Sequence, residues 1–209
     1  KDIFYPRESY ADIEAELDQV TEPACVASLG SLVAREKSAL TTGGFVIHAP
    51  VSQELRGADF SWAVLWDMAC AIRENFDALV EVEGYGRDYV WACGGGMQSA
   101  HLRRFVAGLI NKKVLIRKGY QQASVTGGAN ICAGVLGSVL GGEDQLETVE
   151  PQHQEQYQRW FEKWREVRGG NARMAEGYGG ISGGARPRGT VQKPASRGAG
   201  RDGKRECYD

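Results

Sequence analysis

Long apolar runs are missing from this sequence. No window reaches the roughly 18 to 20 continuous apolar residues of a membrane-spanning helix, and no basic segment followed by an apolar one marks the chain for export. A strong charge of one sign is missing too, because the formal net charge is -2 over 209 residues. These absences argue against a membrane protein and give no reason to expect nucleic acid as the main partner.

Closely spaced cysteines are also missing. The five cysteines are far apart, form no C-x-x-C motif, and four of them stand among apolar or small residues. Cysteines of this kind are ordinarily buried and reduced, so we expect a cytoplasmic protein. The first residue is Lys1 rather than Met, and we therefore also expect the chain to be a piece of a longer protein.

Apolar residues are frequent enough for one sizeable core, at 42% of the chain. Strand-like and helix-like patterns alternate, which predicts an α/β domain with a largely parallel sheet. Strands are predicted at 45–49, 89–93 and 114–116, and helices over 10–20, 59–79 and 102–110, from about 124, and over 151–167. Residues 169–209 are rich in Gly, Arg and Ser, so we expect a folded domain over 1–168 followed by a disordered tail.

The longest predicted helix has two features that the structure can test. Asp59 stands where an N-cap is expected. Apolar residues then recur at intervals of three and four, which predicts one buried face. The members of that face are Phe60, Val64, Met68, Ile72, Phe76 and Leu79, and Trp62 and Trp66 widen it.

Three consecutive glycines follow the second predicted strand, in "YVWACGGGMQSAHLRRFVAGLI". They match neither G-x-G-x-x-G nor G-x-x-x-x-G-K-[ST], and such a turn can exist only for close helix–strand packing. Two features favour a nucleotide instead. Ligands bind at the carboxyl ends of strands in open α/β sheets, and a second glycine pair, Gly127-Gly128, opens the next predicted helix. Helix N-termini direct N–H groups at anions.

In their order, these motifs resemble the C-terminal domain of the FGGY carbohydrate kinases, which have the actin-like, hexokinase-type ATPase fold (ribonuclease H-like). The resemblance covers roughly residues 10–167 and is greatest to the autoinducer-2 kinases. It rests on "ADFSWAVLWDMACAI", "VWACGGGMQSAHLRRFVAGLINKKVLI", "SVTGGANICAGVLG" and "PQHQEQYQRWFEKWREV".

The resemblance implies that ATP binds here and phosphorylates a small sugar or sugar-like polyol, with Mg²⁺ bridging the phosphates. It places the adenine and ribose contacts on Gly95, Gly96 and Ser99, in a loop that begins at Gly94, with Gly127 and Gly128 beside the nucleotide. The family's base and phosphate loops lie in an N-terminal kinase domain and an upstream segment that these 209 residues lack. We therefore assign no catalytic and no metal-binding residue and expect the chain alone to be inactive.

Two alternatives stay open. The first is a nucleotide-binding module without catalysis, either a pseudokinase or a remnant. Trp66 and Gln122 stand where the family has acidic residues, and Gly128 replaces an alanine. The second is an α/β interaction domain whose glycines only pack. Association with a second copy also stays open. His48 and His101 lack Cys, Asp or Glu at metal-ligand spacing, and Arg103-Arg104 is expected on an exposed helix face.

Overall fold

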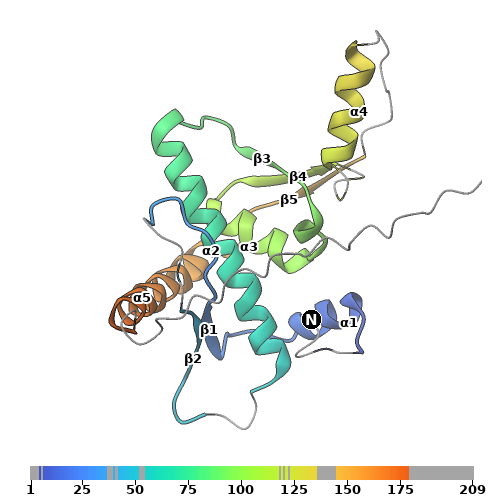
Figure 1. Ribbon diagram of the computed structural model, residues 1–209. Coiled ribbons are helices and arrows are strands. Elements are labelled where there is room, and N and C mark those ends of the chain that lie inside the picture. Colours follow the sequence, from blue (N-terminus) through green and yellow to red (C-terminus); the bar gives the residue numbers. More distant parts are fainter. Residues whose placement is uncertain are drawn as a thin grey trace, which may run out of the picture.

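A computed structural model describes residues 5, 7–36, 40, 42–51, 55–117, 119, 121, 123–135 and 145–178. Its helices are α1 (Tyr10–Leu17), α2 (Gly57–Glu83), α3 (Ala100–Ile110), α4 (Ala123–Val135) and α5 (Gln154–Tyr178). Its strands are β1 (Cys25–Ser28), β2 (Gly44–Ile47), β3 (Tyr89–Ala92), β4 (Lys113–Arg117) and β5 (Leu146–Val149), and a short 3-10 turn, η1, covers Gly95–Gln98. The α/β class predicted from the sequence is confirmed (Figure 1).

The strands form two separate sheets. β1 and β2 make an antiparallel pair, and the other sheet has the order β3-β4-β5. Within it β3 and β4 are parallel, as a strand–helix–strand connection requires, but β5 is antiparallel to β4. The prediction of a largely parallel sheet is therefore wrong: in the described residues one of three strand pairings is parallel. The prediction failed because the short segment 146–149 carries no apolar run that would mark a strand.

α2 is the longest of the described helices; it packs against α3 and β1 and runs past both sheets (Figure 1). It begins at Gly57, and Arg56 is its N-cap. Asp59 is the third residue of the helix, and its carboxylate accepts the Arg56 backbone N–H at 2.8 Å. The predicted N-cap is thus corrected, because Asp59 occupies the position from which an acidic side chain reaches back to the N-cap amide.

The buried face of α2 also differs from the predicted one. Trp62, Trp66 and Cys70 are buried, whereas Met68 and Leu79 are 38% and 59% exposed. The two tryptophans stack on each other and contact Phe105 of α3. Large aromatic rings remove the most surface from water, so they set which side of the helix faces the core.

α5 packs on the same core through its aromatic side chains, with Tyr157, Phe161 and Trp164 buried. It runs to Tyr178, so it continues past the domain end expected at residue 168. Residues 169–178 are helical rather than part of a disordered tail, and the rest of the predicted tail, from 179, lies outside the described residues. Arg168 and Asn171, about one turn apart, are both 5% exposed, so α5 is still packed against the rest of the molecule beyond residue 168.

Candidate nucleotide site

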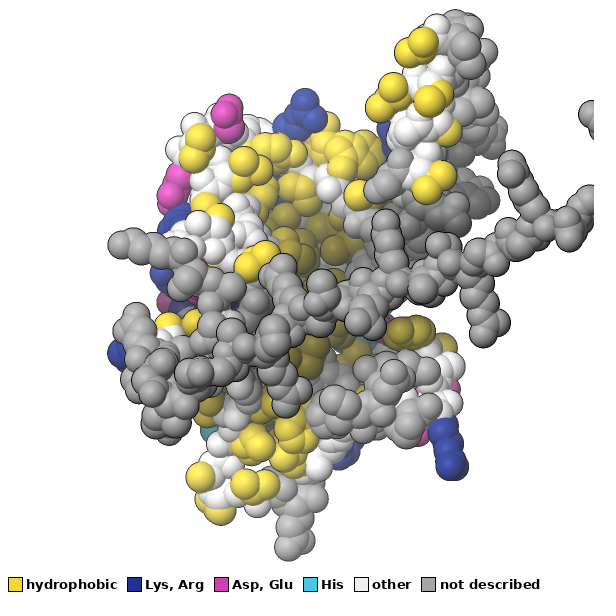
Figure 2. All heavy atoms as spheres, viewed as in Figure 1, with side chains coloured by type: hydrophobic (Ala, Val, Ile, Leu, Met, Phe, Trp, Pro, Cys, Tyr) yellow, Lys and Arg dark blue, Asp and Glu magenta, His cyan; other side chains and the backbone are white. Residues whose placement is uncertain are grey.

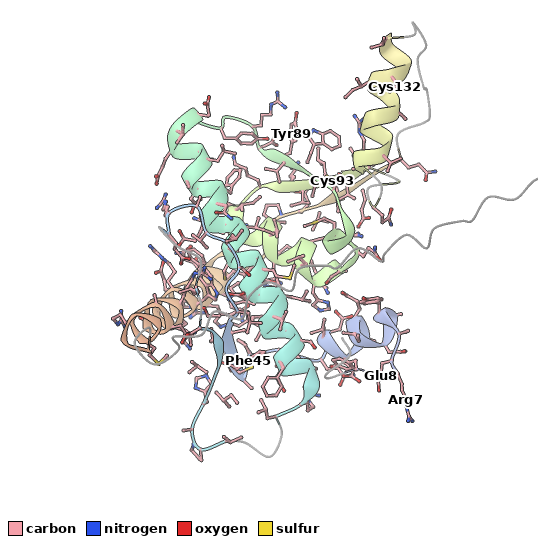
Figure 3. The ribbon with its side chains drawn as sticks, in the orientation of Figure 1. Arg7, Glu8, Phe45, Tyr89, Cys93 and Cys132 are labelled. Carbon is pink, nitrogen blue, oxygen red and sulfur yellow. The ribbon has the colours of Figure 1, made fainter. Side chains whose placement is uncertain are left out.

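The glycine turn, residues 94–98, connects the carboxyl end of β3 to α3. Cys93 is exposed directly after the strand (Figure 3), and Gly95 and Gly96 are exposed as expected. Gly94 has φ 94°, a conformation that favours glycine. Backbone bonds close the turn, because Met97 N–H donates to Gly94 O at 3.1 Å and Ser99 N–H to Gly96 O at 3.3 Å.

The space around each glycine distinguishes a glycine that close packing requires from one that has open space beside it. A Cβ built on Gly95 would meet no neighbour closer than the Gln98 side chain at 4.0 Å, and one on Gly96 would meet Leu102 Cδ2 at an ordinary 3.6 Å. At Gly108 of α3, by contrast, a Cβ would lie 2.4 Å from Gln152 O. Gly108 is therefore a packing glycine. Neither close contact nor backbone strain within the described chain requires Gly95 or Gly96.

Ser99 is the N-cap of α3. Its hydroxyl accepts the Leu102 N–H at 3.2 Å. The Glu14 carboxylate in turn accepts the His101 backbone N–H at 3.4 Å. The hydroxyl and the first amides of α3 are thus already engaged, and a carboxylate stands where an anion would bind. This corrects the expectation that the start of α3 would direct free N–H groups at a phosphate.

Arg103 holds the turn from its other side. Its Nε donates to Met97 O, and its Nη1 lies 2.6 Å from Glu147 Oε1 on β5. Arg103 is 9% exposed, so the prediction that this arginine lies on a solvated face is wrong. A pocket of about 390 Å³, lined by Glu147, Arg117 and Gln121 among others, opens beside this brace at the carboxyl end of β4.

Gly127 and Gly128 are the fifth and sixth residues of α4, which begins at Ala123. They do not open the helix, so the predicted pair of glycine loops at two helix starts is corrected. The helix itself begins close to where the sequence predicted it, at about residue 124. α4 projects from the sheet edge away from the rest of the molecule, and Cys132 marks its exposed side (Figures 1 and 3). A Cβ at either glycine would meet nothing within 4 Å.

The histidines differ in their surroundings. His48 is exposed, whereas His101 is 6% exposed and its Nδ1 and Nε2 lie 2.8 Å and 3.2 Å from carboxylate oxygens of Glu14 and Asp18. In the part of the chain that the structure describes, no three His, Cys, Asp or Glu side chains come together as a metal site would require. None of the described helices combines the length and apolar character of a membrane span.

The overall fold is that of domains in solved carbohydrate kinases, the actin-like ATPase fold. The chain superimposes on a xylulose kinase from Rhodospirillum rubrum with a TM-score of 0.64 and 18% identity, over 84% of this chain and 37% of that one. A glycerol kinase from Plasmodium falciparum, solved with ADP, gives a TM-score of 0.59 and 12% identity over 78% of this chain and 34% of that one.

In sequence, the chain is 42% identical over 169 residues to a protein of Bacillus subtilis (strain 168) named "Putative sugar kinase YoaC". The match covers 80% of this chain and 35% of that protein, so the chain spans about a third of the length of this curated relative. No family profile matches the chain. The predicted likeness to sugar kinases is confirmed, and the likeness to autoinducer-2 kinases stays a prediction.

Sequence reasoning did not find Glu14 or Glu147, which hold the two sides of the glycine turn. Both are acidic residues in segments without a recognisable motif. Glu14 lies 87 positions from His101, and Glu147 lies 44 from Arg103. Contacts over such separations leave no local pattern in a single sequence.

Proposed function

We propose that this chain is the nucleoside-binding part of a sugar kinase, with the adenosine of ATP lying against Gly95 and Gly96. The observation that carries the proposal is the open space at these two positions. Their lack of a Cβ serves no contact inside the described chain, which favours a ligand that approaches the backbone closely. Glycines that only pack should instead resemble Gly108.

The base and ribose of ATP, which are uncharged, fit the surroundings of the glycine turn better than the phosphates of ATP do. Glu14 places a carboxylate at the start of α3, where it would repel a phosphate group. The pocket at the same sheet edge is lined by one positive side chain, Arg117, by two amides, Gln121 and Gln145, and by the acidic Glu147, which is paired with Arg103. We infer that the base and ribose lie on the turn. Gly127 and Gly128 contribute open backbone surface on α4, and Ser99 contributes mainly by capping α3.

The intact enzyme would transfer the γ-phosphoryl group of ATP to a hydroxyl of a small sugar or polyol, a class that includes autoinducer-2-like substrates. Mg²⁺ would neutralise the phosphates. The described residues bring together no set of ligands for this ion, so we derive no step through it. The acceptor and the residues that activate it belong to the other parts of a longer kinase. The four described cysteines are free thiols, as a cytoplasmic setting allows.

Nucleotide titration of the 209-residue chain tests the proposal. Adenosine and ATP are each added while the amide signals of the glycine turn are followed by NMR, which detects weak binding. The unaltered chain should show saturable shifts at Gly95 and Gly96, and Gly95→Val should abolish them while keeping its melting temperature. Gly170→Val on α5 is the matched control, because a Cβ there also meets open space.

Two results would decide against the proposal. If a folded Gly95→Val chain binds nucleotide normally, the glycines have another role. If the amide signals of the unaltered chain do not shift on addition of adenosine or ATP, the chain does not bind a nucleotide at this turn. If nucleotide binds here and the full-length parent turns over no ATP with any sugar, the module without catalysis is the better description.

A further inference from the structure

α1 is attached to the start of α3, immediately after the glycine turn. Leu17 anchors α1 in the core at 1% exposure, and its neighbour Glu14, on the same side of the helix, reaches across to α3. Glu14 Oε2 lies 2.8 Å from His101 Nδ1 and 3.4 Å from the His101 backbone N. The contact is largely shielded from water, since the two side chains are 27% and 7% exposed.

Glu14 also holds the first turn of α3, where the glycine turn ends. Its carboxylate accepts the backbone N–H of His101, the second residue of α3. The N-cap of the same turn is Ser99, whose hydroxyl accepts the Leu102 N–H at 3.2 Å. The Ser99 N–H in turn donates to Gly96 O at 3.3 Å. Glu14 therefore fixes the helical turn that is joined, through the Ser99 backbone, to the exposed Gly96.

A second contact one turn further along keeps α1 in register. Asp18, the C-cap of α1, lies 2.9 Å from Arg104 Nη2 and 3.2 Å from His101 Nε2. His101 therefore sits between two carboxylates, with Arg104 Nη2 3.0 Å from its Nε2. Two polar contacts and one buried leucine fix the orientation of α1, so the position of the Glu14 carboxylate is set by the fold.

We propose that Glu14 is a positioning residue for the nucleoside site. It does not touch the nucleotide. It holds His101 and with it the first turn of α3, so that the glycine turn keeps the shape against which adenosine lies. This inference rests on the proposed function. It predicts that replacing Glu14 weakens the affinity for adenosine. If Glu14 acted only through its charge, the replacement would change only the affinity for ligands that carry phosphates.

The test compares adenosine with ATP in the 209-residue chain and in Glu14→Ala, Glu14→Gln and the control Glu166→Ala, which alters an exposed glutamate of α5. Glu14→Ala should weaken adenosine and ATP by the same factor, about tenfold, and should speed hydrogen exchange at the amides of residues 95–99. Glu14→Gln retains an oxygen that accepts the His101 N–H and should recover most of the affinity, which a role of charge alone would not allow. Glu166→Ala should change neither quantity.

Several outcomes overturn the inference while leaving the proposed function intact. Unchanged adenosine affinity in Glu14→Ala is one, and tighter ATP binding with unchanged adenosine binding is another, because it would show Glu14 acting only by repelling phosphate. Equal loss in Glu14→Gln and Glu14→Ala is a third. If the unaltered chain binds neither ligand, the proposed function itself fails, and the role of Glu14 at a nucleoside site fails with it.

Discussion

At the scale of single residues, Gly108 and Gly170 should respond in opposite directions when each is replaced by alanine. Gly108→Ala should destabilise the fold by about 1 to 3 kcal/mol, because the new methyl group would lie 2.4 Å from Gln152 O and 2.6 Å from the Tyr157 ring. Gly170→Ala, in open space on α5, should stabilise it by about 0.5 to 1 kcal/mol. Urea unfolding measures both. Equal midpoints for the two variants would show that α3 and α5 can separate without cost.

Asp67 is the other residue with a large expected effect. It is 1% exposed and accepts hydrogen bonds from Trp164 Nε1 at 2.8 Å, Ser31 Oγ at 2.8 Å and Leu29 N at 3.3 Å. Asp67→Ala leaves the buried Trp164 Nε1–H and two half-buried donors without their acceptor and should cost about 3 kcal/mol in the free energy of unfolding.

The matched control for Asp67 is Asp77→Ala, whose ion pair with Arg73 is partly exposed and worth about 0 to 1 kcal/mol. Urea unfolding again measures both free energies. A loss for Asp67→Ala no larger than that of Asp77→Ala would mean that water replaces the carboxylate at this position.

At the scale of elements, α1 is the part of the structure most exposed to acid. Hydrogen bonds from Ser99 and His101 outweigh the effect of burial and lower the pKa of Glu14 below its ordinary 4.5, and Arg104 lowers the pKa of Asp18 below 3.8. A carboxyl whose pKa is lowered by folding stabilises the fold above its unfolded pKa. That contribution is lost as the pH falls through the folded value.

We therefore expect the attachment of α1 to weaken as the pH falls below about 4.5. Hydrogen exchange of α1 amides, measured at a series of pH values and corrected for intrinsic rates, should increase before that of α3. Glu14→Gln should reduce this pH dependence. Simultaneous loss of protection in both helices at every pH would show that α1 does not detach separately.

Local sequence patterns predicted where the helices and strands lie better than which of their residues make tertiary contacts. The strand at Tyr89 and the helix from Leu102 were found because apolar periodicity and flanking glycines mark them directly. The buried face of α2 was misread, since spacing alone cannot say which of two apolar stripes contains the residues that pack, and the aromatic contact between Trp66 and Phe105 decides it. The contacts of Glu14 with His101 and of Glu147 with Arg103 were missed because the partners are distant in sequence.

At the scale of the whole molecule, the chain should be unable to phosphorylate a sugar. It spans 35% of its curated relative, and phosphoryl transfer depends on clamping donor and acceptor between positioned groups. Incubation with ATP and a panel of pentoses, hexoses and polyols should give no ADP above a blank. The full-length parent is the control. Steady ATP turnover by the 209-residue chain would contradict the proposal that the residues activating the acceptor belong to other parts of a longer kinase. It would also contradict the site described above.

One edge of the three-stranded sheet has a consequence for the chain in the cell. Among the described residues β3 pairs only with β4, and Trp91 on this strand is 49% exposed beside Arg117, whose guanidinium lies 4.8 Å from the ring centre. Hydrophobic side chains gather on this side between the upper end of α2 and α4 (Figure 2). An open strand edge accepts a strand from any chain that offers one. A strand that pairs with β3 would therefore cover part of Trp91 as well, and a chain made without such a strand would be prone to self-association along this edge.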